Sequence, residues 1–382
     1  MELSKEQMLE LTRCGLWGRE LNLSLFAQGV DWDEVLQLAK QQTLLGIISV
    51  AIEKLPMSMR PERNKALRLH QMVLLNKQYR KHHVEVLGKL LELVGRAGVE
   101  RPVLLKGLGV GLNYHDPTLR QCGDIDLYVG EDYYFKVWDF ICLELGVEKE
   151  ENFSDHHFDF EFMDTNIEIH RYATAPRSVA FNNEEFQKWS KSQLEGDELR
   201  EVSIDGVSLF LPPYNFDFIF IFYHTWRHFL TGGVGLRQLC DWGCYASTFS
   251  DKIDRSEIKR LVTLFKIEKP ISLFATIVVR ALGVAPEAFF CYAVANDRLY
   301  ESALEKIWSR GNFGSYNVDL QRRNKGFVAR KFLGIFAMFR DMNFLATIDR
   351  RYALRFYYLS FFTSVRFAVK ELQQSKSKTV VN

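Results

Sequence analysis

Two aspartates separated by one apolar residue form the most chemically informative pattern in the chain. Asp124 and Asp126 lie in the segment 123–129, GDIDLYV, whose apolar members favour a β-strand. Residues two apart on a strand project from the same face, so the two carboxylates are expected to lie side by side. Carboxylates this close repel each other unless a cation lies between them, and hard divalent ions prefer oxygen ligands. The pattern therefore predicts a divalent-metal site at Asp124 and Asp126.

Glu168 is the best candidate for a third carboxylate. Residues 157–163 alternate polar and apolar, residues 164–166 have turn chemistry, and residues 167–170 are expected to return as the second strand of a hairpin. On that strand Glu168 and His170 share the polar face. Three acids on neighbouring strands can hold two Mg²⁺ ions, with Mn²⁺ as a substitute. One ion would lower the pKa of an attacking hydroxyl, and the other would bind a triphosphate and the leaving pyrophosphate.

A strand, a Lys-Gly turn and a helix precede the aspartates. Residues 103–105 are apolar and predict a strand, and residues 108–114 predict a short helix after Lys106 and Gly107. Asp-x-Asp alone is a weak signal, but this upstream segment and Glu168 strengthen it.

Other charged residues could border the same site. Arg120 could contact a phosphate or form a salt bridge with Asp116. Arg237 and Asp241 follow the glycine-rich loop 232–235, which could close over a nucleotide, although an i,i+4 ion pair between the two is the simpler interpretation. His170 could orient Glu168 or contact substrate, or simply pack. His156 and His157 could border the cleft, while His224 and His228 lie near the glycine-rich loop.

The expected elements predict an α+β protein in which helical regions flank a small mixed β-sheet. We expect an N-terminal helical region over 1–100, an α/β core over 101–211, a C-terminal helical domain over 212–372 and a disordered tail over 373–382. The consecutive prolines 212–213 mark the second boundary. Helices are expected at about 32–48, 65–97, 131–145, 183–191, 214–230, 235–248, 256–268, 270–282, 297–309, 326–345 and 350–372.

Composition is that of an ordinary globular protein. Of 382 residues, 47% are hydrophobic and 25% charged, and the formal net charge is +1. Near-neutral charge gives no overall attraction to nucleic acid, although a local basic groove stays open as an alternative. The six cysteines lack the spacing of a zinc site and fit a reducing compartment. Because the N-terminus lacks a signal-peptide pattern and no run of about 18 uncharged apolar residues exists, we expect a cytoplasmic protein without a membrane span.

The order of these motifs resembles a known family. LLKG at 104–107, then Tyr114 and Pro117, then RQCGDIDLYV at 120–129 and IEIH at 167–170, is similar to an uncharacterised bacterial nucleotidyltransferase family of the polymerase-β-like superfamily. That superfamily usually has Gly-Ser at the turn, where this chain has Lys-Gly. Its gap from the turn to the acids is also usually shorter.

The resemblance implies transfer of a nucleoside monophosphate from an NTP to a hydroxyl acceptor with release of pyrophosphate. By analogy Asp124 and Asp126 hold both metals, Glu168 holds the one nearer the acceptor, and the amides around Gly107 cradle phosphates. The acceptor is unidentified. Near-neutral charge favours a small molecule or a protein over nucleic acid. The predicted nucleotide-binding residues are Lys106, Gly107, Arg120, Gly123, His170, Arg237 and Asp241.

Two competing interpretations remain. Residues 107–111 read G-x-G-x-G and suggest dinucleotide binding, but Leu112 stands where a third glycine belongs and Asp124 is then unexplained. The second alternative is a non-catalytic module that binds a nucleotide or a partner on a degenerate nucleotidyltransferase fold. The three acids Asp124, Asp126 and Glu168 argue against it. The sequence does not indicate the base preference of the NTP or the oligomeric state.

Overall fold

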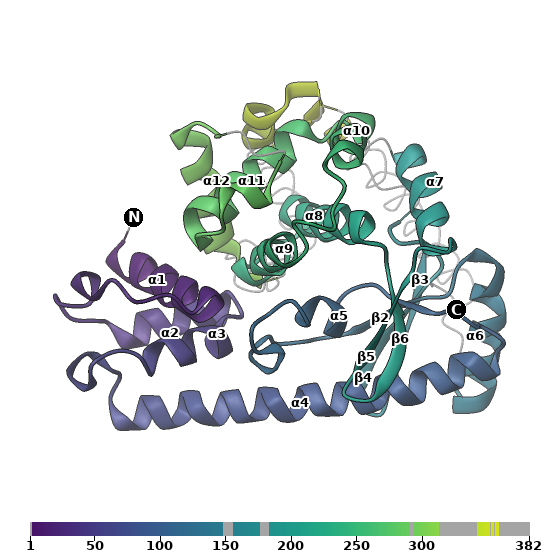
Figure 1. Ribbon diagram of the computed structural model, residues 1–382, viewed down its shortest axis with the longest axis horizontal. Helices are drawn as coiled ribbons and strands as arrows, with labels where there is room; N and C mark the ends of the chain where they lie inside the picture. Colours follow the sequence, from purple (N-terminus) through teal and green to yellow (C-terminus); the bar gives the residue numbers. More distant parts are fainter. Residues whose placement is uncertain are drawn as a thin grey trace, which may run out of the picture.

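The chain is an α+β protein in which one six-stranded mixed sheet lies among helices, as predicted (Figure 1). The computed structural model describes residues 2–147, 156–175, 183–290, 294–312, 342–351, 353–354 and 356–358. The predicted helix 326–345 and the C-terminal part of 350–372 lie largely outside these residues, and the predicted tail 373–382 lies wholly outside them.

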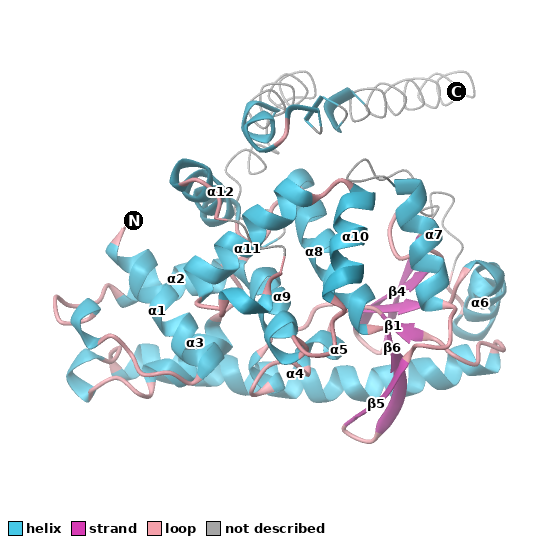
Figure 2. Ribbon diagram, turned by 45° about the horizontal axis from the view of Figure 1, so that its top comes forward, coloured by secondary structure: helices cyan, strands magenta, loops and turns pink. Residues whose placement is uncertain are grey.

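Four helices precede the sheet. They are α1 (Leu3–Trp17), α2 (Trp32–Gln41), α3 (Leu45–Ile52) and α4 (Arg63–Arg96). The Asp31 carboxylate accepts hydrogen bonds from the amides of Asp33 and Glu34, which satisfies the first donors of α2. Figures 1 and 2 show α4 running along one side of the molecule, under α1–α3 at its start and under the sheet at its end. This helix therefore supports both regions.

The sheet has the strand order β3-β4-β2-β1-β6-β5. Its strands are β1 (Val103–Leu104), β2 (Ile125–Tyr128), β3 (His157–Phe162), β4 (Thr165–His170), β5 (Arg200–Ile204) and β6 (Val207–Leu211). Strand β2 pairs parallel with β4 and antiparallel with β1, while β1 pairs parallel with β6. The predicted hairpin is confirmed, because β3 and β4 are antiparallel.

Two details of the predicted sheet were wrong. The β3–β4 connection is Met163-Asp164 rather than residues 164–166, and φ is positive at both residues (51° and 57°), as in a type I′ hairpin turn. Strand β5 was not predicted, because its residues are mostly polar and only Ile204 is buried. It lies at the edge of the sheet, where one side of the strand has no neighbouring strand.

The two faces of the sheet have different partners. Buried apolar side chains on one face pack against the C-terminal half of α4 and against α6 (Glu131–Leu145). From the three strands that carry acids they are Ile125, Leu127, Phe158, Phe160, Ile167 and Ile169. The opposite face of those strands carries polar residues, and α8 (Tyr214–Thr231) and α9 (Leu236–Thr248) lie on that side (Figure 1).

The helices after the sheet form a large aromatic core. Besides α8 and α9 they include α10 (Arg255–Phe265), α11 (Glu268–Leu282) and α12 (Asp297–Arg310), while α5 (Leu108–Gly111) and α7 (Asn183–Leu194) belong to the middle of the chain. Trp226 and Trp242 are fully buried there. Core residues of α1–α3 join the same cluster, so the first and last helical regions pack together. Among the described helices, none is long and apolar enough to cross a bilayer.

Candidate functional site

Strand register brings the acids together on the polar face of the sheet. Asp126 on β2 lies opposite Glu168 on β4, and Glu168 lies opposite Asp159 on β3. The next row joins Tyr128, His170 and His157 in the same way. Residues directly opposite each other, and residues two apart on a strand, share a face. The result is a row of three carboxylates beside a row that contains two imidazoles.

Asp126 is the buried centre of this cluster, with 1% of its surface exposed. The Lys106 ammonium lies 2.7 Å from Asp126 Oδ1, and His170 Nε2 lies 3.0 Å from the same oxygen. A carboxylate this buried needs such partners, because an isolated charge is strongly destabilised away from water. Two basic side chains therefore contact the same buried carboxylate oxygen.

The surrounding basic side chains keep the Glu168 carboxylate in its ionised form. Burial by itself raises the pKa of Glu168, but the hydrogen bond from His170 and the charges of Lys106 and His170 lower it to about 2. The Asp124 charge opposes this shift, which indicates that the third acid lies within electrostatic range. Burial lowers the pKa of His170, yet its hydrogen bonds to Asp126 and Glu168 raise it overall. His170 Nε2 therefore bridges the two carboxylates, at 3.0 Å from Asp126 Oδ1 and 3.2 Å from Glu168 Oε2.

The Lys106-Gly107 turn lies directly against the start of β2. Gly107 has φ +59° and ψ −117°, a backbone conformation that is strongly disfavoured for every residue except glycine. A Cβ added there would lie 3.3 Å from the Asp124 carbonyl oxygen. Glycine is thus needed both for the turn and for its close approach to the strand that carries the acids. The turn directs Lys106 to Asp126.

A cavity of about 220 Å³ opens between this acidic floor and the helices α8 and α9. The floor includes Asp124, Asp126 and Glu168. The opposite side carries basic and polar side chains: His224, Arg227 and His228 from α8, and Arg237, Gln238 and Asp241 from α9. Lys106 Nζ lies 3.5 Å from His224 Nδ1, so the lysine connects the two sides. Such a cavity can accept a polyanion that brings its own divalent cations.

Arg120 and Asp241 form a fully paired group in the wall of the cavity. Arg120 donates to both carboxylate oxygens of Asp241, from Nε at 2.7 Å and from Nη2 at 2.8 Å. Tyr114 donates its hydroxyl to Asp241 Oδ1 at 2.7 Å, and Arg237 lies 3.4 Å from Oδ2. The expected alternative of an Arg120–Asp116 salt bridge was wrong, since Arg120 pairs with Asp241. These contacts fix α9 to the segment that precedes β2.

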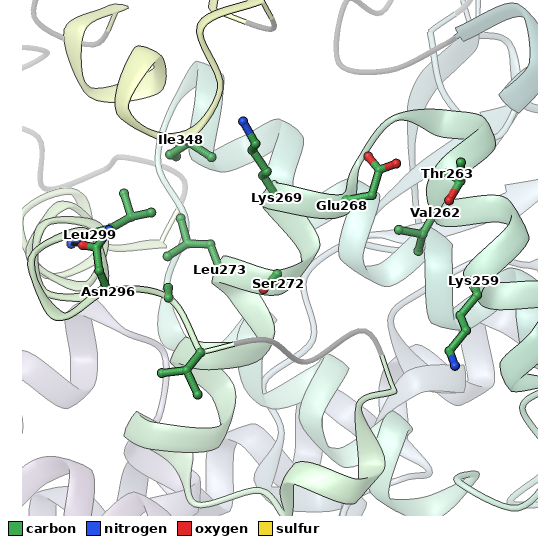
Figure 3. Close-up of a pocket in the computed structure, with 12 residues that line it drawn as sticks. Lys259, Val262, Thr263, Glu268, Lys269, Ser272, Leu273, Asn296, Leu299 and Ile348 are labelled. Atoms are coloured by element: carbon green, nitrogen blue, oxygen red, sulfur yellow. Dashed lines mark hydrogen bonds between the residues drawn. The ribbon is translucent and has the colours of Figure 1, made fainter.

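A larger cavity of about 610 Å³ lies elsewhere, between α10, α11, α12 and residue 348 (Figure 3). Figure 3 shows Leu273 and Ile348 on its walls and Lys269 at one side. Glu268 is the single acid in its described lining, and that lining includes no histidine or cysteine. Its size alone therefore does not make it the chemical site, and the smaller acidic cavity is the better candidate.

Nine of the predicted site residues line the acidic cavity: Lys106, Gly107, Arg120, Gly123, Asp124, Asp126, Glu168, Arg237 and Asp241. The tenth, His170, contacts Asp126 and Glu168 from a buried position. One group of metal-capable atoms joins Asp126, Glu168 and His170, while Asp124 lines the same cavity without belonging to that group.

Sequence reasoning missed Asp159 and Arg227. Asp159 is visible in the alternation of β3, where it shares a face with His157. Arg227 follows His224 by three residues and precedes His228, so the three side chains share one face of α8. Both signals were present in the sequence, but only the fold places them near the acids.

His156 and His157 should make the free energy of unfolding depend on pH. Burial, followed by the charges of His157 and His170, lowers the pKa of His156 to about 2. Burial, followed by the charge of His170, lowers the pKa of His157 to about 4. Unfolded histidine titrates near 6.5, so below about pH 6.5 the unfolded chain binds protons that the folded chain does not. The free energy of unfolding should therefore fall as pH falls from about 6.5 to about 4.

Urea unfolding across this pH range would measure the effect. His156→Asn should flatten the pH dependence, whereas His115→Asn, at an exposed position, serves as the matched control. Equal slopes for the wild type and His156→Asn would contradict the prediction.

Comparison with known proteins supports the interpretation of the motifs. A family described as "Uncharacterised nucleotidyltransferase" matches residues 28–283, which is more than half of the chain. The chain therefore belongs to this nucleotidyltransferase family. The matched region extends from just before α2 to the end of α11 and contains all ten predicted site residues. No curated protein and no solved structure matches the chain significantly.

Proposed function

We propose that this protein is a metal-dependent nucleotidyltransferase of the polymerase-β-like superfamily. It would transfer a nucleoside monophosphate from an NTP to a hydroxyl acceptor and release pyrophosphate. The observation that carries the proposal is the register of β2 and β4, which sets Asp126 opposite Glu168. Asp124 precedes Asp126 by two residues and borders the same cavity. Membership in a nucleotidyltransferase family supports the same activity.

The donor set fits a hard divalent cation. The ligand atoms of Asp126, Glu168 and His170 lie within 4.8 Å of one another, and Asp124 adds a further carboxylate to the cavity. Asp124, Asp126 and Glu168 would hold Mg²⁺ or Mn²⁺. When bound, such ions lower the pKa of an attacking hydroxyl and neutralise charge on the phosphates.

The remaining side chains would bind and orient the substrates. Lys106, at the Gly107 turn, and Arg237 on α9 would neutralise the triphosphate from opposite sides of the cavity. Arg120 and Asp241 are already paired with each other, so we assign them to positioning the turn and α9. The acceptor hydroxyl would lie near Glu168, which the β4 register places on the β3 side of Asp126.

Pyrophosphate release would test the proposal directly. The full-length protein with Mg²⁺ should release pyrophosphate from at least one labelled NTP when a cell extract supplies acceptors. The labelled product would identify the acceptor class as small molecule, protein or RNA. Absence of release and of labelling with all four NTPs would contradict catalysis.

A non-catalytic nucleotide-binding module is the second candidate, and one observation favours it. Lys106 and His170 both contact the single oxygen Asp126 Oδ1, so two basic side chains of the protein already occupy the position of a cation beside the central acid. Such a module should be stabilised thermally by NTP without releasing pyrophosphate. The same pair of assays therefore separates the two candidates.

Lys106→Ala should raise the KM for NTP by roughly tenfold or more, since a hydrogen bond to a charged group contributes about 1.5–3 kcal/mol. Initial rates of pyrophosphate release at varied NTP concentration would measure it. Lys252→Ala, on an exposed surface lysine, is the matched control. An unchanged KM in Lys106→Ala would remove this lysine from the phosphate site.

A further inference from the structure

The outer edge of the polar sheet face holds a second group of metal-capable side chains. His157 and Asp159 on β3 and Glu168 on β4 each offer one ligand atom, and these atoms lie within 4.8 Å of one another. His157 Nε2 lies 3.1 Å from Asp159 Oδ1. The group stands on the β3 side of Glu168, whereas Asp126 stands on its β2 side. It is therefore distinct from the cluster around Asp126, although both share Glu168.

The hairpin fixes this group in place. Asp159 lies directly opposite Glu168, and His157 lies two residues before Asp159, opposite His170. Phe158 and Phe160, which flank Asp159, are buried against the opposite face of the sheet. Ile167 and Ile169, which flank Glu168 on β4, are buried on the same side, so the alternation of both strands keeps the three polar side chains on the other face. The backbone of two paired strands, rather than a loop, thus sets the ligand geometry.

His157 has the arrangement expected of a metal-binding imidazole. Its Nδ1 lies 2.6 Å from His156 Nε2, while its Nε2 points to the carboxylates. When Nδ1 donates to His156, Nε2 presents a lone pair to Asp159 and Glu168. Ligating histidines usually have the second ring nitrogen hydrogen-bonded, which fixes the tautomer and the ring orientation. His156 would serve as that outer partner.

The accessibility of the group suits a binding site. The side chain of Asp159 is 55% exposed, while His157 and Glu168 are 19% and 21% exposed. An ion could therefore reach the ligands from solvent and keep water in its remaining coordination positions. One imidazole nitrogen and two carboxylates make a mixed donor set. Such a set suits first-row transition metals such as Mn²⁺, Co²⁺ or Zn²⁺ better than it suits Mg²⁺.

We infer that His157, Asp159 and Glu168 form a separate binding site for a divalent transition metal at the β3–β4 edge of the cavity. The site does not depend on nucleotidyl transfer, although it uses Glu168 from the other side. Because both sites use Glu168, an ion at this edge changes the affinity of the Asp126 cluster for metal, and the reverse holds equally.

Co²⁺ titration of the full-length protein would test the inference, read out by calorimetry and by the visible absorption of bound Co²⁺. Wild type and Asp126→Asn should both bind Co²⁺ with an imidazole ligand. His157→Gln and Asp159→Asn should each weaken that binding by roughly tenfold or more, because each removes a direct ligand. Glu161→Gln is the matched control, since it removes an exposed carboxylate from the same face of β3.

Each outcome has a defined meaning. Co²⁺ binding that is unchanged in both His157→Gln and Asp159→Asn would overturn the inference. Loss of all Co²⁺ binding in Asp126→Asn would also overturn it, because the ion would then belong to the Asp126 cluster. Circular dichroism would verify that each variant is folded. Asp126→Asn separates the two proposals, because it should lose transfer while it keeps Co²⁺ at the β3–β4 edge.

Discussion

Asp126→Asn is expected to abolish nucleotidyl transfer. Asparagine keeps the size of the side chain but removes the charge that binds the cation, at the centre of the acidic cluster. Replacing residues that only support a metal ligand typically costs about 10–100-fold, so loss of a direct ligand should exceed that range. Pyrophosphate release with Mg²⁺ would measure the activity. Calorimetric titration with Mg²⁺ and NTP should show weakened binding in the same variant.

The control must separate lost chemistry from lost folding. Asp126 contacts Lys106 and His170, so the substitution also removes two charged interactions. Circular dichroism and thermal unfolding would show whether the variant keeps its fold. Asp164→Asn is the matched change, because Asp164 lies exposed in the β3–β4 turn at positive φ, where asparagine is tolerated. Transfer retained in Asp126→Asn at the wild-type rate would refute the assignment of this residue as a metal ligand.

Local patterns were sufficient to predict much of the fold. The alternation in β3 and the apolar residues of β4 predicted the hairpin, and the acid pair predicted β2, because each depends on residues close in sequence. The predicted start of a helix at residue 32 is confirmed, but its predicted end at about 48 was wrong, because residues 42–44 separate α2 from α3 and Thr43 has φ +60°. Strand β5 was missed, since a polar edge strand lacks the apolar signal of a buried one.

The arrangement of the site was less predictable, because it depends on contacts between distant segments. That Glu168 lies opposite Asp126 follows from the parallel register of β2 and β4, and a shift by one residue would turn Glu168 to the other face. Asp159 joined the row only once the register of both strand pairs was known. Arg120 and Asp241 are 121 positions apart, and no local pattern connects them.

The buried Arg120–Asp241 pair should have the largest effect on stability. Both side chains are almost fully buried, at 4% and 7% exposed. Burial raises the pKa of Asp241, but the charge and hydrogen bonds of Arg120 lower it below its usual value. Asp241→Asn would leave the guanidinium without its counter-charge. Removing one partner of a buried ion pair typically costs about 3–5 kcal/mol, so urea unfolding should show a loss of that size.

A double substitution separates the effect of leaving one buried charge unpaired from the effect of changing the side chains at these two positions. Arg120→Met with Asp241→Leu removes both charges and keeps apolar volume, so the double variant should be more stable than Asp241→Asn alone. Tyr114→Phe removes one hydrogen bond to the same carboxylate and leaves the ion pair in place, so its cost should be smaller, about 1.5–3 kcal/mol. Glu257→Gln, which breaks an exposed pair with Arg260, should cost less than about 1 kcal/mol. If Asp241→Asn costs no more than Glu257→Gln does, the buried pair does not hold α9 to the segment before β2. The cavity would then need another support, because α9 supplies Arg237 and Gln238 to its wall.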